Sequence, residues 1–237
     1  MPATITAQTD VSPDLADAFR RLIAQRRSVR AFLPDAVPEP VMREVFELAQ
    51  WSPSNCNTQP WTVLIASGAT RDRLAAALVA HVDGGGHQQG DLPYLRKLYP
   101  EDFQARQVDH IVRQQTALGI DRDDKASRHD LLRQQLSFFG APHVALLFMP
   151  DWGNEREASD LGMFAQSLLL SLTALGLAGL PQTLLGLYAP VVREVLDVPP
   201  GVKLLFGISF GYEREGAKGV RLDQEREPWG STVHLLK

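Results

Sequence analysis

Two short segments of the sequence concentrate side chains that could bind a ligand. The first, "SPSNCNTQPW" at 52–61, carries Ser54, Asn55, Asn57 and Gln59 but no acidic or basic residue. Hydroxyl and amide groups both donate and accept hydrogen bonds, which suits a flat heterocycle with alternating N–H and C=O groups. The same residue types also form ordinary turns for local reasons. The segment alone leaves both interpretations open.

The second segment, "RRSVR" at 26–30, places Arg26, Arg27 and Arg30 beside the hydroxyl of Ser28. A guanidinium group pairs phosphate oxygens in a planar, bidentate way that lysine does not match. The functional interpretation is therefore a phosphate site. In the alternative, these arginines only complement the negative end of a preceding helix, a surface effect of about 0.3–1 kcal/mol.

Weaker signals lie further along the chain. In "GLAGLPQTLLG" at 176–186 a long apolar helix runs into Gly and Pro, so the backbone N–H groups of Gln182 and Thr183 are candidates to face a ligand. The closing segment "VRLDQEREP" offers Arg221 and Arg226, for which a solvated charge run is the alternative. Neither signal specifies a site by itself.

Cys56 is the only cysteine of the chain. It cannot form an intramolecular disulfide. A nucleophilic thiol needs an activating neighbour and no histidine lies near it in the sequence, so we interpret Cys56 as a small packing residue. His81, Asp83 and His87 come nearest to a metal-ligand pattern, but the Gly- and Gln-rich sequence around His87 favours a solvated loop.

The bulk composition excludes several classes of protein. The chain has 237 residues, 44% of them hydrophobic, which suits one large domain or at most two small ones. A net charge of −4 provides no global basic field for nucleic acid or an anionic membrane surface. The N-terminal sequence lacks the pattern of a signal or transit peptide, so we expect a cytoplasmic protein.

A stretch without charged residues extends from Leu161 to Val192. Its length raises the possibility of a membrane helix, but polar residues interrupt it and Gly176, Gly179 and Pro181 break it. A helix that is apolar on all sides in a soluble chain is buried, either in the core or between subunits. The second case predicts an obligate dimer.

Hydrophobic periodicity predicts helices with few strands, and hence one α+β domain. Helices are expected from Pro13 to about residue 25, over 39–50, 71–81, 94–120 with a break at Pro100, 124–139, within 161–175 and over 190–198. Strands are expected at 61–67, where the residues suggest a buried strand, at 143–149 and at 203–212. Residues 83–93 are predicted to be a loop and 213–237 a charged, irregular tail.

Taken together, the segments resemble the FMN-dependent nitroreductase family. The resemblance rests on "RRSVRAF", "SPSNCNTQPW", "FFGAPHVALLF", "DLGMFAQSLLLSLTALGLAGLPQ" and "QEREP", and the insert "YLRKLYPEDFQARQ" is similar to the nitrobenzoate reductase branch. It implies a three-layer fold, with an antiparallel or mixed sheet flanked by helices, in an intertwined homodimer. It also implies a single domain over 1–237, with a helical insert at about 84–125 and a C-terminal extension at about 213–237.

The resemblance assigns roles to residues in three groups. The phosphate and ribityl chain of FMN would contact Arg26, Arg27, Ser28, Arg30 and, from the tail, Arg226, with Arg221 as a second candidate. The partner subunit would bring residues 55–59 to the flavin, whose ring and ribityl chain would be bordered by Pro53, Ser54, Asn55 and Asn57. The flavin ring would also be lined by Pro181, Gln182 and Thr183.

Two residues depart from the family pattern. Val220 stands where close relatives have Asn, and Leu180 stands where many have Cys. Neither change removes a phosphate contact, but both bear on flavin tuning or on the shape of the pocket.

The resemblance implies an NAD(P)H oxidoreductase that reduces nitroaromatic or similar flat electrophiles by a ping-pong mechanism. FMN carries the chemistry, which explains why no catalytic acid or base stands out, and NADPH or NADH is a transient hydride donor. Phe103 and Arg106 are candidate substrate contacts, with a solvent-facing helix as the alternative. The other functions considered are enone reduction, dehalogenation or a biosynthetic dehydrogenation on the same scaffold, and a non-catalytic protein that binds a phosphorylated partner.

Overall fold

One antiparallel sheet organises the part of the chain that the structure describes. The computed structural model describes residues 13–121, 123–217, 222 and 225–236. Within these residues the strands lie in the order β1-β2-β4-β3, and each neighbouring pair is antiparallel. Their bounds are Thr62–Ser67 for β1, His143–Pro150 for β2, Ala178–Gln182 for β3 and Val202–Gly211 for β4. The predicted α+β class with an antiparallel sheet is confirmed.

The helices follow the predicted periodicities closely. Their bounds are Pro13–Gln25 for α1, Glu39–Ala49 for α2, Gly68–Asp83 for α3, Glu101–Leu118 for α4, Lys125–Leu136 for α5, Glu155–Ala174 for α6, Ala189–Val195 for α7 and Trp229–Thr232 for α8. The helix predicted over 124–139 ends at Leu136, because Phe138 and Phe139 adopt φ values of 61° and 52°. Such left-handed backbone cannot continue a right-handed helix.

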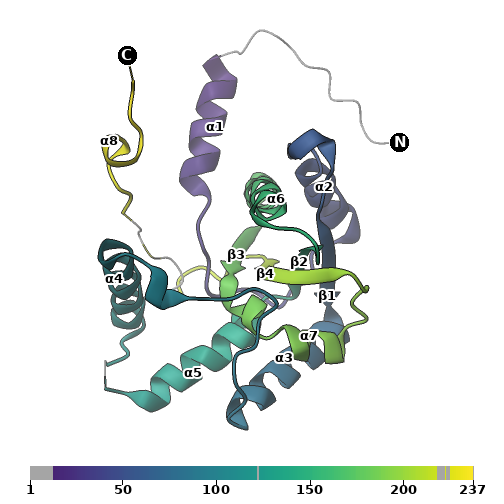
Figure 1. Cartoon of the computed structure of the whole chain (residues 1–237), viewed down its shortest axis with the longest axis vertical. Coiled ribbons are helices and arrows are strands. Elements are labelled where there is room, and N and C mark those ends of the chain that lie inside the picture. The colour runs from purple at the N-terminus through teal and green to yellow at the C-terminus, as the bar shows by residue number, and fades with distance from the viewer. Residues whose placement is uncertain (1–12, 122, 218–221, 223–224, 237) are drawn as a thin grey trace.

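Helices cover both faces of the sheet, which gives three layers (Figure 1). Successive side chains of a strand point to opposite faces. In β2, Val144, Leu146 and Phe148 join the hydrophobic core under α3, α5 and α7. The residues between them, Ala145, Leu147 and Met149, join the core under α2 and α6. The predicted three-layer arrangement is therefore present in this chain.

The helix α6 contains the first part of the charge-free stretch, residues 161–174, but it begins six residues earlier with the charged residues Glu155, Arg156, Glu157 and Asp160. Its buried residues Leu161, Phe164, Leu168 and Leu172 recur at spacings of three and four, as one face of a helix requires. A capping box begins it, in which Asn154 and Glu157 satisfy the first backbone N–H groups. Within the described residues, no helix combines the length and apolar content needed to cross a membrane.

One strand was missed and the burial of another was wrongly predicted. No strand was predicted at 178–182, where the sequence was expected only to break the preceding helix, but this segment forms β3. Gly176, with a φ of 74°, ends α6 in a left-handed turn, and Gly179 packs so closely that an added Cβ would lie 2.8 Å from Leu169 Cδ2. The strand β1 was predicted to be buried, but it is an edge strand in which only Ala66 is buried.

Candidate functional site

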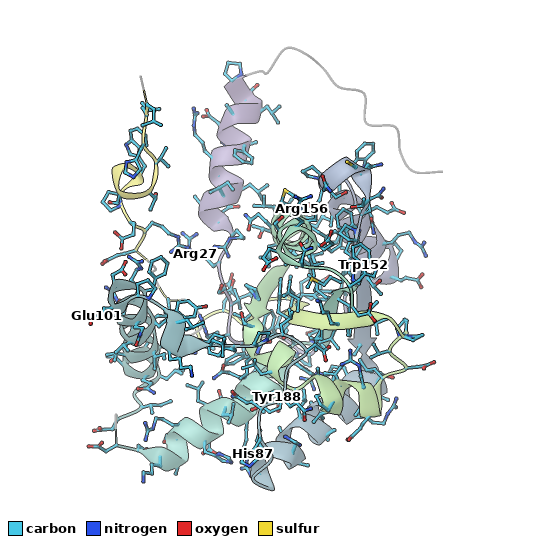
Figure 2. The ribbon with its side chains drawn as sticks, in the orientation of Figure 1. Arg27, His87, Glu101, Trp152, Arg156 and Tyr188 are labelled. Carbon is cyan, nitrogen blue, oxygen red and sulfur yellow. The ribbon has the colours of Figure 1, made fainter. Side chains whose placement is uncertain are left out.

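One large cleft brings together many of the residues that the sequence analysis singled out. It has a volume of about 790 Å³ and opens between the end of α1, β3, α6, α4 and the C-terminal segment. Its lining residues are Ile23, Arg26, Arg27, Ser28, Arg30, His110, Gln166, Leu169, Pro181, Leu222 and Arg226. Figure 2 labels Arg27 just beyond the end of α1, on the side that faces α4 and the C-terminal segment.

The segment 26–30 is fixed because it runs along the free edge of β3. Ser28 forms a parallel bridge with Gly179, and Val29 is buried in the core. Farther on, the backbone N–H of Arg214 donates to the carbonyl of Ala31 at 3.0 Å. This extended backbone lets Val29 anchor the segment while the arginine side chains on either side of it reach the cleft.

The described lining of the cleft carries several arginines and no acidic residue. No ion pair within the described residues involves Arg26, Arg27 or Arg30, and no described carboxylate lines the cleft. Burial lowers the pKa of Arg26, and the nearby charges of Arg226 and Arg27 lower it further. Burial also lowers the pKa of Arg30. Crowded, partly desolvated guanidinium groups favour a bound anion, and phosphate matches their geometry.

The edge strand β3 supplies a second wall. Pro181 and Thr183 are exposed, whereas Gln182 is buried. The side chain of Gln182 is already satisfied, because its Nε2 donates to the Gln135 carbonyl at 2.8 Å and its Oε1 accepts from the Ser209 hydroxyl. The side chain of Gln182 therefore supports the wall. A proline is tolerated here because an edge strand needs no N–H on its outer side.

A smaller chamber of about 160 Å³ adjoins the cleft, with which it shares Arg30, His110 and Pro181. Its other lining residues are Gln114, Gln135, Phe139, Leu180, Gln182, Thr183 and Leu184. Amide side chains, backbone groups and a ring beside an arginine can recognise the edge and the face of a flat, polar heterocycle.

The loop that contains Pro53, Ser54, Asn55 and Asn57 lies elsewhere. None of these residues lines the cleft. The loop follows α2, which Figure 1 shows on the opposite side of the sheet region from α4. One chain thus presents the arginine cleft and the amide-rich loop as separate regions, and the predicted contact of this loop with a partner's flavin stays a prediction.

This loop has an unusual backbone. Cys56, Asn57 and Gln59 have φ values of 50°, 58° and 48°, in the left-handed region that costs non-glycine residues energy. The buried Asp160 accepts the backbone N–H of Asn55 at 3.1 Å, and the Ser54 hydroxyl accepts the N–H of Gln59 at 2.9 Å. The loop is therefore held in a strained shape by Asp160 and Ser54, together with the Gln59 side chain, whose Nε2 donates to the Asn57 carbonyl at 3.1 Å.

The two candidate substrate residues lie on α4 and do not line the cleft. The guanidinium of Arg106 lies over the ring of Phe103, 4.4 Å from its centroid. It also pairs with Asp102 and with Glu227, each at 3.0 Å. Arg106 is engaged with carboxylates of this chain, so its substrate role remains a prediction.

Some lining residues were missed from the sequence, notably His110 and Gln166. His110 lies four residues after Arg106, on the same face of α4, so helical spacing from Arg106 would have found it. Gln166 is one of several polar side chains within the charge-free part of α6, and nothing in the sequence set it apart from them. Val220 and Arg221 lie outside the described residues, so the choice between Arg221 and Arg226 rests on Arg226 alone, which does line the cleft.

Comparisons with known proteins find relatives that cover most of the chain. The chain is 50% identical over 220 residues to nitroreductase NfnB of Mycolicibacterium smegmatis, covering 92% of this chain and 93% of that protein. It is 31% identical to a 4-nitrobenzoate reductase of Pseudomonas putida, covering 94% and 97%. The crystal structure of the FMN-dependent nitroreductase NfnB from Mycobacterium smegmatis in complex with NADPH matches with a TM-score of 0.89 and 47% identity, covering 94% of this chain and all of that one.

The model of the nitroreductase family matches residues 23–212, which include the arginine segment, the amide-rich loop and the whole sheet. The chain therefore belongs to the nitroreductase family.

Proposed function

We propose that this protein is an FMN-dependent nitroreductase that uses NADPH to reduce nitroaromatic compounds. One observation carries the proposal: a cleft at a sheet edge holds several arginines, and Arg26, Arg27 and Arg30 have no ion-pair partner among the described residues. Relatives that cover most of this chain are named for nitroreductase activity, and the structure of one of them contains NADPH.

The residues present fit FMN. Arg26, Arg27, Ser28 and Arg30 would hold the phosphate and the ribityl chain, and Arg226 would reach the phosphate from the other side of the cleft. The flavin ring would lie along Pro181, Gln182 and Thr183. The fit is chemical as well as spatial, because a phosphate dianion offsets the mutual repulsion of the arginines.

We infer that a second copy of the chain completes the site. On α1, Leu15, Phe19 and Ile23 form an exposed apolar stripe, with 58%, 55% and 43% of their surfaces accessible. Such a stripe on a soluble protein fits a subunit interface. In the homodimer, Pro53, Ser54, Asn55 and Asn57 of one subunit would border the flavin held by the other. This arrangement would explain why a single chain keeps its two polar regions apart.

Bound FMN would supply the hydride and electron transfer. The chain's own groups would bind and orient the cofactor and the flat substrate, and the dimer interface would exclude water. Residues 52–61 contain no acidic or basic residue, which suits a role in binding the cofactor and not in proton transfer. Their dipoles can stabilise a change of charge on the flavin without exchanging protons.

We also propose that residues 1–237 form one domain, in which about 84–125 is a helical insert and about 213–237 a C-terminal extension. The family model ends at residue 212, which supports the second boundary. We further propose a cytoplasmic location, where NADPH is available as the reductant.

The experiment starts from the colour of the purified protein. It should be yellow and should release FMN on denaturation. Under anaerobic conditions NADPH should bleach the flavin absorbance, and 4-nitrobenzoate should restore it. Protein that stays colourless after incubation with FMN would contradict the site. If neither NADPH nor NADH bleaches bound FMN, the reductase assignment is wrong.

A further inference from the structure

The C-terminal segment is attached to α4 at two points that flank Arg226. Glu225 pairs with Arg113 at 3.4 Å, and Glu227 pairs with Arg106 at 3.0 Å. Between them, Arg226 lines the cleft. The two carboxylates thus contact α4 on either side of an arginine that faces the cleft, and Arg226 Nη1 also donates to the Glu225 carbonyl at 3.0 Å.

The spacing on α4 matches this attachment. Arg106, His110 and Arg113 share one helical face at spacings of four and three. The two arginines hold the segment, and His110 between them lines the same cleft as Arg226. The segment runs antiparallel to α4, because the earlier glutamate meets the later arginine. Two points of attachment fix the direction of the segment as well as its position.

Both arginines of α4 are themselves oriented within the helix. Arg106 also pairs with Asp102 at 3.0 Å, and Arg113 also pairs with Asp109 at 2.7 Å, each one helical turn earlier. The hydrogen bonds of Arg113 with Glu225 and Asp109 raise its pKa. Each guanidinium therefore bridges a carboxylate of α4 and a carboxylate of the C-terminal segment.

The attachment opposes an electrostatic cost. Arg226 approaches Arg26 closely enough for its charge to lower the pKa of Arg26. In the absence of an anion, like charges favour moving the segment away from the cleft. A phosphate between the two guanidinium groups reverses the sign of this interaction.

We propose that Arg106 and Arg113 are positioning residues that hold the C-terminal segment through Glu227 and Glu225, so that Arg226 closes on the cofactor phosphate. This inference rests on the proposed function and goes beyond it, because it assigns a role to four residues that do not contact the cofactor. The segment then acts as a clasp, and it slows cofactor release more than it speeds binding.

The test compares FMN with riboflavin, which lacks the phosphate. The double variant Arg106→Glu with Arg113→Glu should weaken FMN binding by roughly three- to tenfold, in line with two exposed ion pairs, mainly through faster dissociation. Riboflavin binding should change little. The matched control is Arg43→Glu with Arg73→Glu, which makes the same change of net charge on α2 and α3, and it should bind FMN as the unmodified protein does.

Reversing the polarity of the pairs provides the second arm. Adding Glu225→Arg and Glu227→Arg to the double variant, with Asp102→Asn and Asp109→Asn to remove the like charges one turn earlier on α4, recreates both pairs with opposite signs and should restore slow FMN release. A double variant that matches its control, or an equal loss of riboflavin binding, would overturn the inference, and so would a reversed variant that fails to recover. If the unmodified protein binds no FMN, the proposed function itself fails, which is a different result.

Discussion

The arginine cleft and the amide-rich loop both present polar groups, but they differ in backbone conformation and in side-chain charge. In the cleft, the backbone of residues 26–30 is extended and pairs with β3, while its guanidinium groups carry unbalanced charge. In the loop, the side chains are neutral and exposed, while the backbone is strained at Cys56, Asn57 and Gln59. The positive charge of the cleft favours a bound anion. The fixed backbone of the loop presents its amide groups in one arrangement, which favours a ligand of matching shape.

This difference fits the proposal that the two regions are halves of one site, contributed by different subunits. An anion site can be assembled from flexible arginines, since the ligand itself orders them. A surface that meets the cofactor from another subunit gains from being rigid beforehand, because ordering it on binding would cost entropy. The strain of the loop is consistent with this need.

The largest effect is expected from removing positive charge from the cleft, which tests whether the cleft binds an anion. Arg30→Ala should yield protein that folds but lacks flavin, with FMN binding weakened by about 2–5 kcal/mol, the cost of truncating one side of a charged hydrogen-bonded pair. The fold should survive because the only described hydrogen bond of its side chain goes to the Ser28 carbonyl at 3.2 Å. Quenching of flavin fluorescence gives the affinity.

Arg43→Ala is the control for this change, since Arg43 is an exposed arginine on α2. If Arg30→Ala retained full flavin occupancy, the arginine segment would be only a solvated helix end, and the contrast between the two regions would disappear.

Subunit mixing tests whether the halves belong to different chains. Arg30→Ala disables the cleft, and Asn55→Ala with Asn57→Gly removes the loop amides while keeping a residue that tolerates a positive φ. Each variant alone should bind FMN poorly. A heterodimer purified through two different tags should regain about one FMN per dimer, because one of its two equivalent sites is intact. Heterodimers without flavin would show that the loop serves the cleft of its own chain, and a loop variant that binds FMN normally by itself would show that the loop serves no cleft.

Asp160 allows the loop to be weakened without touching its exposed amides. Asp160→Leu leaves the N–H of Asn55 without its acceptor and should cost about 1–3 kcal/mol of unfolding free energy, measured by urea denaturation. Asp160→Asn keeps an oxygen acceptor at the same place and should cost less. Equal losses for both variants would mean that the negative charge, and not the hydrogen bond, supports the loop.

The sequence predicted the regular frame well because that frame depends on local patterns. The stripe of Leu15, Phe19, Leu22 and Ile23 specifies α1, and the alternating core residues of β2 need no distant information. The strand β3 escaped because its residues "AGLPQ" lack β-branched side chains. It forms because β4 offers it hydrogen bonds and because Gly179 can approach α6, and both are tertiary effects.

The site was predictable in its residue types and less so in its assembly. "RRSVR" signalled a phosphate site, and the structure places its arginines around one cleft. The position of Arg106 could not be foreseen, because its partner Glu227 is 121 residues away in the sequence. His143 also escaped notice, since only the pairing of β1 with β2 places it between Ser67 and the segment that leads to α2.

His143 makes the attachment of the segment that leads to α2 sensitive to acid. Its Nε2 accepts the backbone N–H of Val37 at 2.9 Å, so Nδ1 carries the proton and faces the Ser67 hydroxyl at 2.5 Å. The ring is buried and stacks on Phe210, 5.1 Å between centroids, and burial lowers the pKa of His143. A second proton would face the N–H of Val37 and would break that hydrogen bond.

The sign of the pH dependence follows from this lowered pKa. Above the unfolded pKa of about 6.5 neither state binds the proton, so His143 adds no pH dependence. Below it the unfolded chain takes up a proton that the folded chain resists, and stability falls toward the lower folded pKa by up to about 1.4 kcal/mol per pH unit. Urea midpoints at pH 7.5 and 5.5 should therefore differ more for the unmodified protein than for His143→Gln, whose amide oxygen can still accept from Val37 but does not titrate. If the urea midpoints of the two proteins fell equally between pH 7.5 and pH 5.5, the acid sensitivity would belong to another residue.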